Sequence, residues 1–116
     1  MSSLAIHHLD HEEKRRLFTY LRKALRPGGL LVVADIVLPT TDEALRIAAE
    51  EWDAAVRDRS RELRGDLSVF DKFQELEWNL FLDPAGDPAE KPSSLFDQLH
   101  WFAEAGFRNV DVHWMR

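Results

Sequence analysis

The feature that most constrains the fold is a helix-ending turn followed at once by an apolar run. The turn is Pro27-Gly28-Gly29, and the run covers residues 30–38, Leu-Leu-Val-Val-Ala-Asp-Ile-Val-Leu. Proline cannot continue a helix, and glycine adopts the left-handed conformation that closes a helix end at little steric cost. Because the run is rich in β-branched residues and has no polar alternation, it predicts a strand covered on both faces.

Asp35 is the charged residue that interrupts this run. A carboxylate within a buried strand is costly unless it is paired or lies where the strand ends. In open α/β sheets, ligands bind outside the carboxyl ends of the strands. Asp35 is therefore predicted to belong to a substrate pocket. The alternative is a hydrogen-bonded structural carboxylate that shapes the following loop.

Composition limits the size of the fold and the classes of partner. A chain of 116 residues predicts one domain with a modest core. The formal net charge of -6 argues against nucleic acid or an anionic membrane as the partner. The chain has no cysteine, which excludes disulfides, thiolate metal sites and cysteine nucleophiles. Its apolar runs are too short to span a bilayer and its first residues lack a signal-peptide pattern, so we expect a cytoplasmic protein.

Helical patterns occupy most of the remaining chain. Asp10 and Glu13 predict a capping box at the start of a helix that ends near residue 25. Lys14 is expected to face water on that helix. Thr40 is predicted to cap a long second helix that ends near Gly65, and a third helix follows up to about residue 81. Residues 83–94 hold three of the five prolines and predict a loop, and a short helix over residues 95–105 follows it.

The order of these elements predicts an α/β protein. A strand end at residues 4–9 precedes the first helix, and residues 110–115 alternate apolar and polar side chains like a strand. Strands that alternate with helices favour a largely parallel sheet with right-handed crossovers. Two or three strands are too few for a self-sufficient sheet, so we expect both ends to be truncated. We also expect a homodimer or higher assembly through the open sheet edges.

Three segments resemble the second half of a class I S-adenosylmethionine-dependent methyltransferase. They are residues 3–10 (Ser-Leu-Ala-Ile-His-His-Leu-Asp), residues 25–35 (Leu-Arg-Pro-Gly-Gly-Leu-Leu-Val-Val-Ala-Asp) and residues 99–110, which contain Ala105-Gly106-Phe107. In that family such segments end the fourth strand, open the fifth and precede the sixth. The resemblance implies a partial Rossmann-like sheet with flanking helices. It also implies a single partial domain over residues 1–116, with a helical insertion at residues 40–94.

The resemblance also implies site residues. Ser3, Leu4 and Ala5 would pass the methionine portion of S-adenosylmethionine, and His7 or His8 would orient the acceptor or take its proton. The alternative for each histidine is a packing role. Adjacent side chains in extended chain point to opposite sides, so the two imidazoles are not expected to act on one atom.

The residues offer two further candidate sites. Trp52 is a candidate for lining the acceptor pocket, although an aromatic side chain at helical spacing is more often part of the core. His7, His8 and His11 lack an acidic residue at supportive spacing, so no metal site is predicted.

The family's cofactor loop has no counterpart in this chain. No Gly-x-Gly sequence occurs, and Gly28-Gly29 is assigned to the helix-to-strand turn. The isolated chain is therefore expected to bind S-adenosylmethionine weakly or not at all and to be inactive, while its parent would methylate a small-molecule or other acceptor. The alternative function is a non-enzymatic, acidic, helical module that binds a protein partner through the helices between residues 52 and 81.

Overall fold

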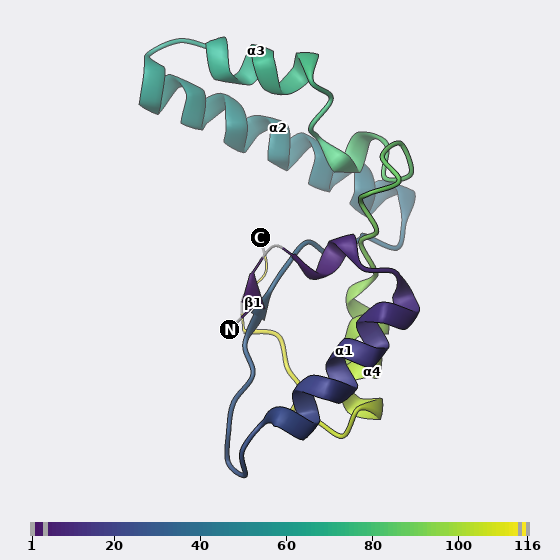
Figure 1. Cartoon of the computed structure of the whole chain (residues 1–116). Helices are drawn as coiled ribbons and strands as arrows, with labels where there is room; N and C mark the ends of the chain where they lie inside the picture. The colour runs from purple at the N-terminus through teal and green to yellow at the C-terminus, as the bar shows by residue number, and fades with distance from the viewer. Residues whose placement is uncertain (1, 4, 114, 116) are drawn as a thin grey trace. The chain divides into compact units, whose positions relative to one another are not determined.

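The protein is mainly helical in the computed structural model, which describes residues 2–3, 5–113 and 115. The helices are α1 (His11–Ala24), α2 (Asp42–Arg64), α3 (Ser68–Glu75) and α4 (Leu95–Glu104), shown in Figure 1. The short elements are two 3-10 helices, η1 (Ile6–His8) and η2 (Leu80–Leu82), and two strands, β1 (Ser2–Ser3) and β2 (Val33–Ala34). The chain divides into two compact units: unit 1 is Met1–Val37 with Lys91–Arg116, and unit 2 is Leu38–Glu90.

Helix α1 begins where the sequence predicts. The Asp10 carboxylate accepts a hydrogen bond from the Glu13 amide at 2.8 Å, and the Glu13 carboxylate accepts one from the Asp10 amide at 3.0 Å, so the capping box is confirmed. Phe18 is fully buried and stacks on Phe102 of α4, with 4.0 Å between ring centroids. This contact holds α1 and α4 side by side in unit 1 (Figure 1).

The predicted buried strand over residues 30–38 is wrong for most of its length. Only β2 is a strand, and it pairs in parallel with β1. Val37 adds one isolated parallel bridge to Ser93. Leu30 and Val32 are 80% and 44% exposed, so the run is not covered on both faces. Strand propensity is realised only where neighbouring strands supply hydrogen bonds and packing, and this pairing is too short to do so.

The predicted fold class is consequently wrong as well. An α/β fold with a partial Rossmann-like sheet requires several paired strands, whereas the described residues pair only as β1 with β2 and at the Val37–Ser93 bridge. Residues 110–113 and 115 are not in a strand either, and Trp114 lies outside the described residues. Helices form through local hydrogen bonds, so they were predicted more accurately than strands, which need distant partners. The expected assembly through open sheet edges loses its structural basis with the sheet.

Unit 2 is a helical hairpin of α2 and α3. The N-cap of α2 is Thr41 rather than Thr40, and its hydroxyl accepts a hydrogen bond from the Ala44 amide at 3.1 Å. The helix ends at Gly65, whose φ of 73° is the left-handed conformation predicted for a C-cap. Figure 1 shows α3 returning along α2.

One buried hydroxyl fixes the turn between these helices. The Ser60 hydroxyl donates to the Asp66 carbonyl at 2.8 Å and accepts from the Val69 and Phe70 amides at 3.2 and 3.3 Å. Two of the first amides of α3 are thereby satisfied, which a helix start otherwise leaves to water or a capping side chain. Ser60 therefore determines where α3 begins.

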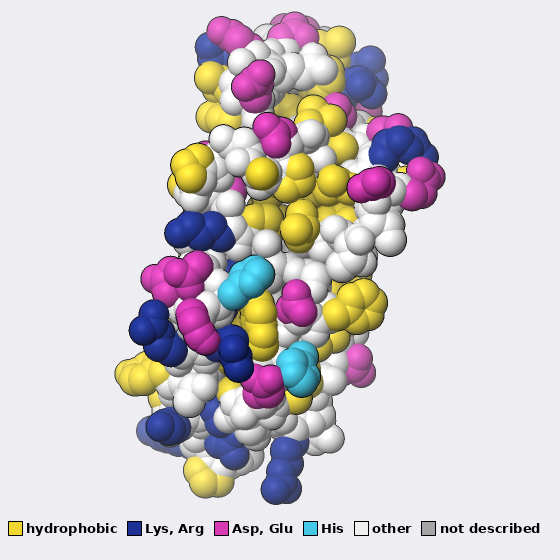
Figure 2. Space-filling view, turned by 90° about the vertical axis from the view of Figure 1, so that its right-hand side faces the viewer, with side chains coloured by type: hydrophobic (Ala, Val, Ile, Leu, Met, Phe, Trp, Pro, Cys, Tyr) yellow, Lys and Arg dark blue, Asp and Glu magenta, His cyan; other side chains and the backbone are white. Residues whose placement is uncertain are grey.

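The surface mixes charged and apolar side chains. Figure 2 shows hydrophobic side chains among acidic and basic ones on the face in view. The large exposed apolar residues include Tyr20 and Leu30 in unit 1 and Leu63, Val69 and Trp78 in unit 2. Among the described residues, no helix combines the length and the apolar character that crossing a membrane requires.

Candidate functional site

Unit 1 encloses a hydrogen-bonded pair, His7 and Asp35. The Nδ1 atom of His7 lies 2.5 Å from Oδ1 of Asp35, and the His7 amide donates to Oδ2 at 3.0 Å. The two side chains are only 7% and 3% exposed. An ionised carboxylate can only accept hydrogen bonds, so Nδ1 donates in this contact, and Nε2 is the acceptor nitrogen when the imidazole is neutral. The pair thus fixes both the tautomer and the orientation of the imidazole.

The local backbone explains why two residues so far apart in sequence meet. Asp35 directly follows β2, and His7 lies in η1, shortly after β1. Because β1 and β2 run parallel, the segments that leave them emerge at the same end of the pair. Asp35 also accepts a hydrogen bond from the Ile36 amide at 2.8 Å. The carboxylate predicted to need a partner therefore has several, as a buried charge requires.

Lys14 is a second buried polar group in this unit, so the prediction that it faces water is wrong. Its ammonium donates to the Lys91 carbonyl at 2.5 Å and to the Ser93 hydroxyl at 2.7 Å, and the residue has no exposed surface. Burial lowers the pKa of Lys14, while the Asp35 and Asp10 carboxylates oppose that change by favouring the charged form. The sequence held a signal, because Lys14 lies four residues before Phe18 on the apolar face of α1.

Residues 91–93, which we call the strap, are part of this cluster. The Lys91 amide donates to the His7 carbonyl at 2.7 Å. Ser93 is buried, bridges Val37, and accepts at its carbonyl a hydrogen bond from the Gln98 side chain at 3.1 Å. The predicted loop over residues 83–94 therefore ends in an ordered segment that contacts η1, α1 and α4.

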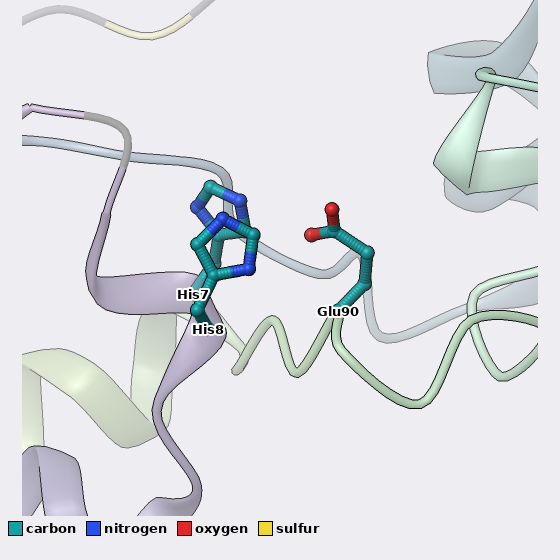
Figure 3. Close-up of side chains that lie close together, drawn as sticks. All are labelled: His7, His8 and Glu90. Carbon is teal, nitrogen blue, oxygen red and sulfur yellow. The ribbon is translucent and has the colours of Figure 1, made fainter.

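His8 lies beside His7 rather than pointing away from it. Their ring centroids are 4.1 Å apart with an angle of 42° between the planes, and Figure 3 shows the two rings next to each other. The prediction of diverging side chains assumed extended chain, but both residues lie in the 3-10 helix η1. His7 is buried and His8 is exposed, so the two histidines differ in environment.

The predicted cofactor residues lie at or near β1. Ser3 pairs through its backbone with Ala34, Ala5 is exposed, and Leu4 lies outside the described residues. Their role toward S-adenosylmethionine stays a prediction.

Trp52 lies in unit 2, where its ring centroid is 5.3 Å from that of Phe81 and 6.1 Å from that of Phe73. Asn79 lies in the same core and donates to the Ala49 carbonyl at 2.8 Å. These contacts favour the core role that helical spacing offered as the alternative for Trp52.

The described histidines of unit 1 do not by themselves form a three-ligand metal site. The ring of His11 packs on Trp101, with 5.1 Å between centroids. His7 and His8 offer two imidazoles, and within the described part of unit 1 no further histidine or carboxylate completes a group of three with them. Protein zinc sites use three or four such ligands. Glu90, the third side chain labelled in Figure 3, belongs to unit 2.

No protein-family model matches this chain, and no curated protein matches it. The resemblance of three segments to methyltransferases therefore has no independent support from a matching family or relative. The functional proposal depends on the residues of the site and on that resemblance.

Proposed function

We propose that this chain is part of an S-adenosylmethionine-dependent methyltransferase with a small-molecule acceptor. In this proposal His7 takes up the acceptor's proton and Asp35 orients the His7 imidazole. The observation that carries the proposal is the buried His7–Asp35 pair beyond the carboxyl ends of β1 and β2. The resemblance assigns the segment that holds His7 to the region of the transferred methyl group, and Asp35 was predicted from its place in the apolar run to belong to a substrate pocket. Histidine oriented by a carboxylate is a common general base.

The residues for binding the cofactor itself do not fit. The chain has no Gly-x-Gly turn to hold the methionine end. Of the three predicted cofactor residues, only Ala5 has a described side chain, and that side chain has no polar atom. We therefore assign to this chain the acceptor side of the reaction only. By itself it is expected to bind S-adenosylmethionine weakly or not at all and to be inactive.

The pair is suited to one chemical task. An oxygen or nitrogen nucleophile that gains a carbon must lose its proton, and Nε2 of His7 is the ring nitrogen that accepts it when Nδ1 donates to Asp35. The carboxylate then stabilises the imidazolium, as the acid does in hydrolase triads. Burial of the pair keeps the imidazole fixed, so that positioning supplies part of the rate.

The test compares two lengths of the polypeptide. The 116-residue chain and the same chain extended by the codons upstream of residue 1 are assayed for S-adenosylmethionine binding by calorimetry. Transfer of a labelled methyl group to a panel of small alcohols, phenols and amines is then measured. We expect binding and transfer with the extended polypeptide only. Absence of binding there, or micromolar binding by the short chain, contradicts the proposal.

Point variants assign the role of the pair within the extended polypeptide. Asp35→Asn keeps the shape of the side chain but removes the charge that orients His7, and we expect kcat to fall by about 10²-fold or more with little change in KM. Asp58→Asn, at an exposed site on α2, is the matched control and is expected to leave kcat unchanged. Equal kcat values for the two variants would show that the His7–Asp35 pair takes no part in the reaction.

The non-enzymatic interaction module is the second candidate, and an observation on unit 2 favours it. Val56, Phe73 and Trp78 line a hollow of about 470 Å³, and Trp78 is 63% exposed. Exposed apolar surface of this kind often marks a binding site. This candidate expects a stable monomer by light scattering. An upstream frame that encodes a glycine-rich turn after a strand would exclude it.

A further inference from the structure

Lys14 occupies a position where a charged side chain is costly. It has no exposed surface, and its neighbours on the same face of α1 are apolar, including the fully buried Phe18. An ammonium is removed from water at a cost of several kcal/mol unless hydrogen bonds and an opposite charge compensate. A methionine of similar length would fill the same space without that cost. We therefore expect the ammonium of Lys14 to have a role beyond packing, which depends on its hydrogen bonds.

The contacts of the ammonium lead to the strap. Both hydrogen-bond acceptors, the Lys91 carbonyl and the Ser93 hydroxyl, belong to residues 91–93. Each lies within a residue that makes a second contact: the Lys91 amide donates to the His7 carbonyl, and Ser93 bridges Val37. Val37 is two residues beyond Asp35. The strap therefore contacts the backbone on both sides of the His7–Asp35 pair, and Lys14 anchors the strap to α1.

The Asp35 carboxylate favours the charged form of Lys14 and so opposes the lowering of its pKa by burial. Asp35 itself accepts hydrogen bonds from the His7 imidazole, the His7 amide and the Ile36 amide, which together fix the position of its carboxylate.

We propose that Lys14 is a positioning residue, which keeps the His7–Asp35 hydrogen bond in place by anchoring the strap. Its part in catalysis rests on the proposed function, whereas its part in holding the pair does not. Loss of the ammonium is expected to loosen the strap first and then the pair. Helix α1 itself should persist, because its capping box is independent of Lys14.

The test reads the pair directly in the 116-residue chain, without cofactor or turnover. A short histidine–aspartate hydrogen bond gives a strongly downfield Nδ1 proton signal in NMR, which Asp35→Asn should remove and thereby assign. We expect Lys14→Met to abolish this signal or to speed its exchange with water about tenfold, the effect of losing a charged hydrogen bond. Lys23→Met, at an exposed site on α1, is the matched control and should leave the signal intact.

A second variant keeps the test decisive if Lys14→Met does not fold. Ser93→Ala removes one acceptor of the ammonium and leaves the charge in place, so we expect the signal to remain with faster exchange. An unchanged signal and unchanged exchange in a folded Lys14→Met protein, or in Ser93→Ala when the first variant is unfolded, overturns the proposal. Because no step of the measurement involves methyl transfer, this result is separate from the test of the enzymatic function.

Discussion

The two units of the chain are stabilised in different ways. Unit 2 is held by contacts between consecutive helices, with an aromatic cluster around Trp52 and a turn fixed by Ser60. Unit 1 is held by contacts between segments far apart in sequence, and several of them are polar and buried, such as His7 with Asp35 and Lys14 with Ser93. Buried polar pairs specify geometry more than they add stability. The buried polar contacts of unit 1 are therefore where we place the candidate chemistry. Unit 2 has the simpler, more apolar core.

The largest expected effect on stability comes from removing the apolar contact between Phe18 and Phe102 in unit 1. Phe18→Ala should destabilise unit 1 by about 3 to 5 kcal/mol, because it leaves a cavity between α1 and α4. Hydrogen exchange measured residue by residue should show faster exchange in α1 and α4 and little change in α2 and α3. Phe96→Ala, at a side chain that is 71% exposed, is the control. An equal loss of protection in both units would mean that they do not unfold separately.

Removing the Asp35 carboxylate is expected to cause the next largest loss of stability. Asp35→Ala deletes the acceptor of the His7 imidazole, the His7 amide and the Ile36 amide, and should cost unit 1 about 3 kcal/mol. Denaturant unfolding followed by a probe in unit 1 measures the loss. Asp111→Ala, at an exposed residue, should change the stability by only a few tenths of a kcal/mol. A similar small change for Asp35→Ala would show that the pair is not formed in solution.

Removing a buried polar group from unit 2, the Ser60 hydroxyl, is expected to cost less stability than removing the Asp35 carboxylate from unit 1. Ser60→Ala removes the hydroxyl that holds the turn between α2 and α3 and should cost unit 2 about 1 to 3 kcal/mol. The amides of Val69 and Phe70 should lose protection first, which hydrogen exchange can detect. If those amides stayed protected, α3 would begin independently of Ser60 and the assigned role of the hydroxyl would be wrong.

The smallest effect is a pH dependence from Lys14. Its pKa is lowered from 10.5 in the folded protein by burial, so the unfolded chain binds more protons between the lowered pKa and 10.5. The free energy of unfolding should therefore gain a contribution that rises with pH across that window and is absent below it. Lys14→Met should remove this rise, whereas Lys23→Met should keep it. A falling contribution, or the same slope in both variants, would contradict the assignment.

The sequence predicted features that depend on neighbouring residues and missed those that depend on distant ones. The capping box of α1 and the end of α2 near Gly65 depend on residues at the helix ends themselves, and both were predicted. The strand over residues 30–38 failed because its outcome depends on partners elsewhere in the chain. The same apolar run forms a buried strand in one context and an exposed segment in another.

The candidate site was predicted in part for the same reason. Asp35 was identified because a charge in an apolar run needs a partner, and His7 was named from the resemblance. Their contact depends on the parallel pairing of β1 with β2 and on the bend at η1, which no local pattern encodes. Lys14 was missed because lysine is rarely buried, although its helical spacing placed it on the apolar face.

The most direct test of the account is the tautomer of His7 in the folded 116-residue chain. Nitrogen-15 NMR of the imidazole at neutral pH distinguishes a proton held on Nδ1 from one held on Nε2. We predict a proton on Nδ1 with a through-bond coupling to the Asp35 carboxylate. A proton on Nε2 alone, or an imidazole signal averaged as in an exposed histidine, would contradict the buried pair on which the proposed function depends.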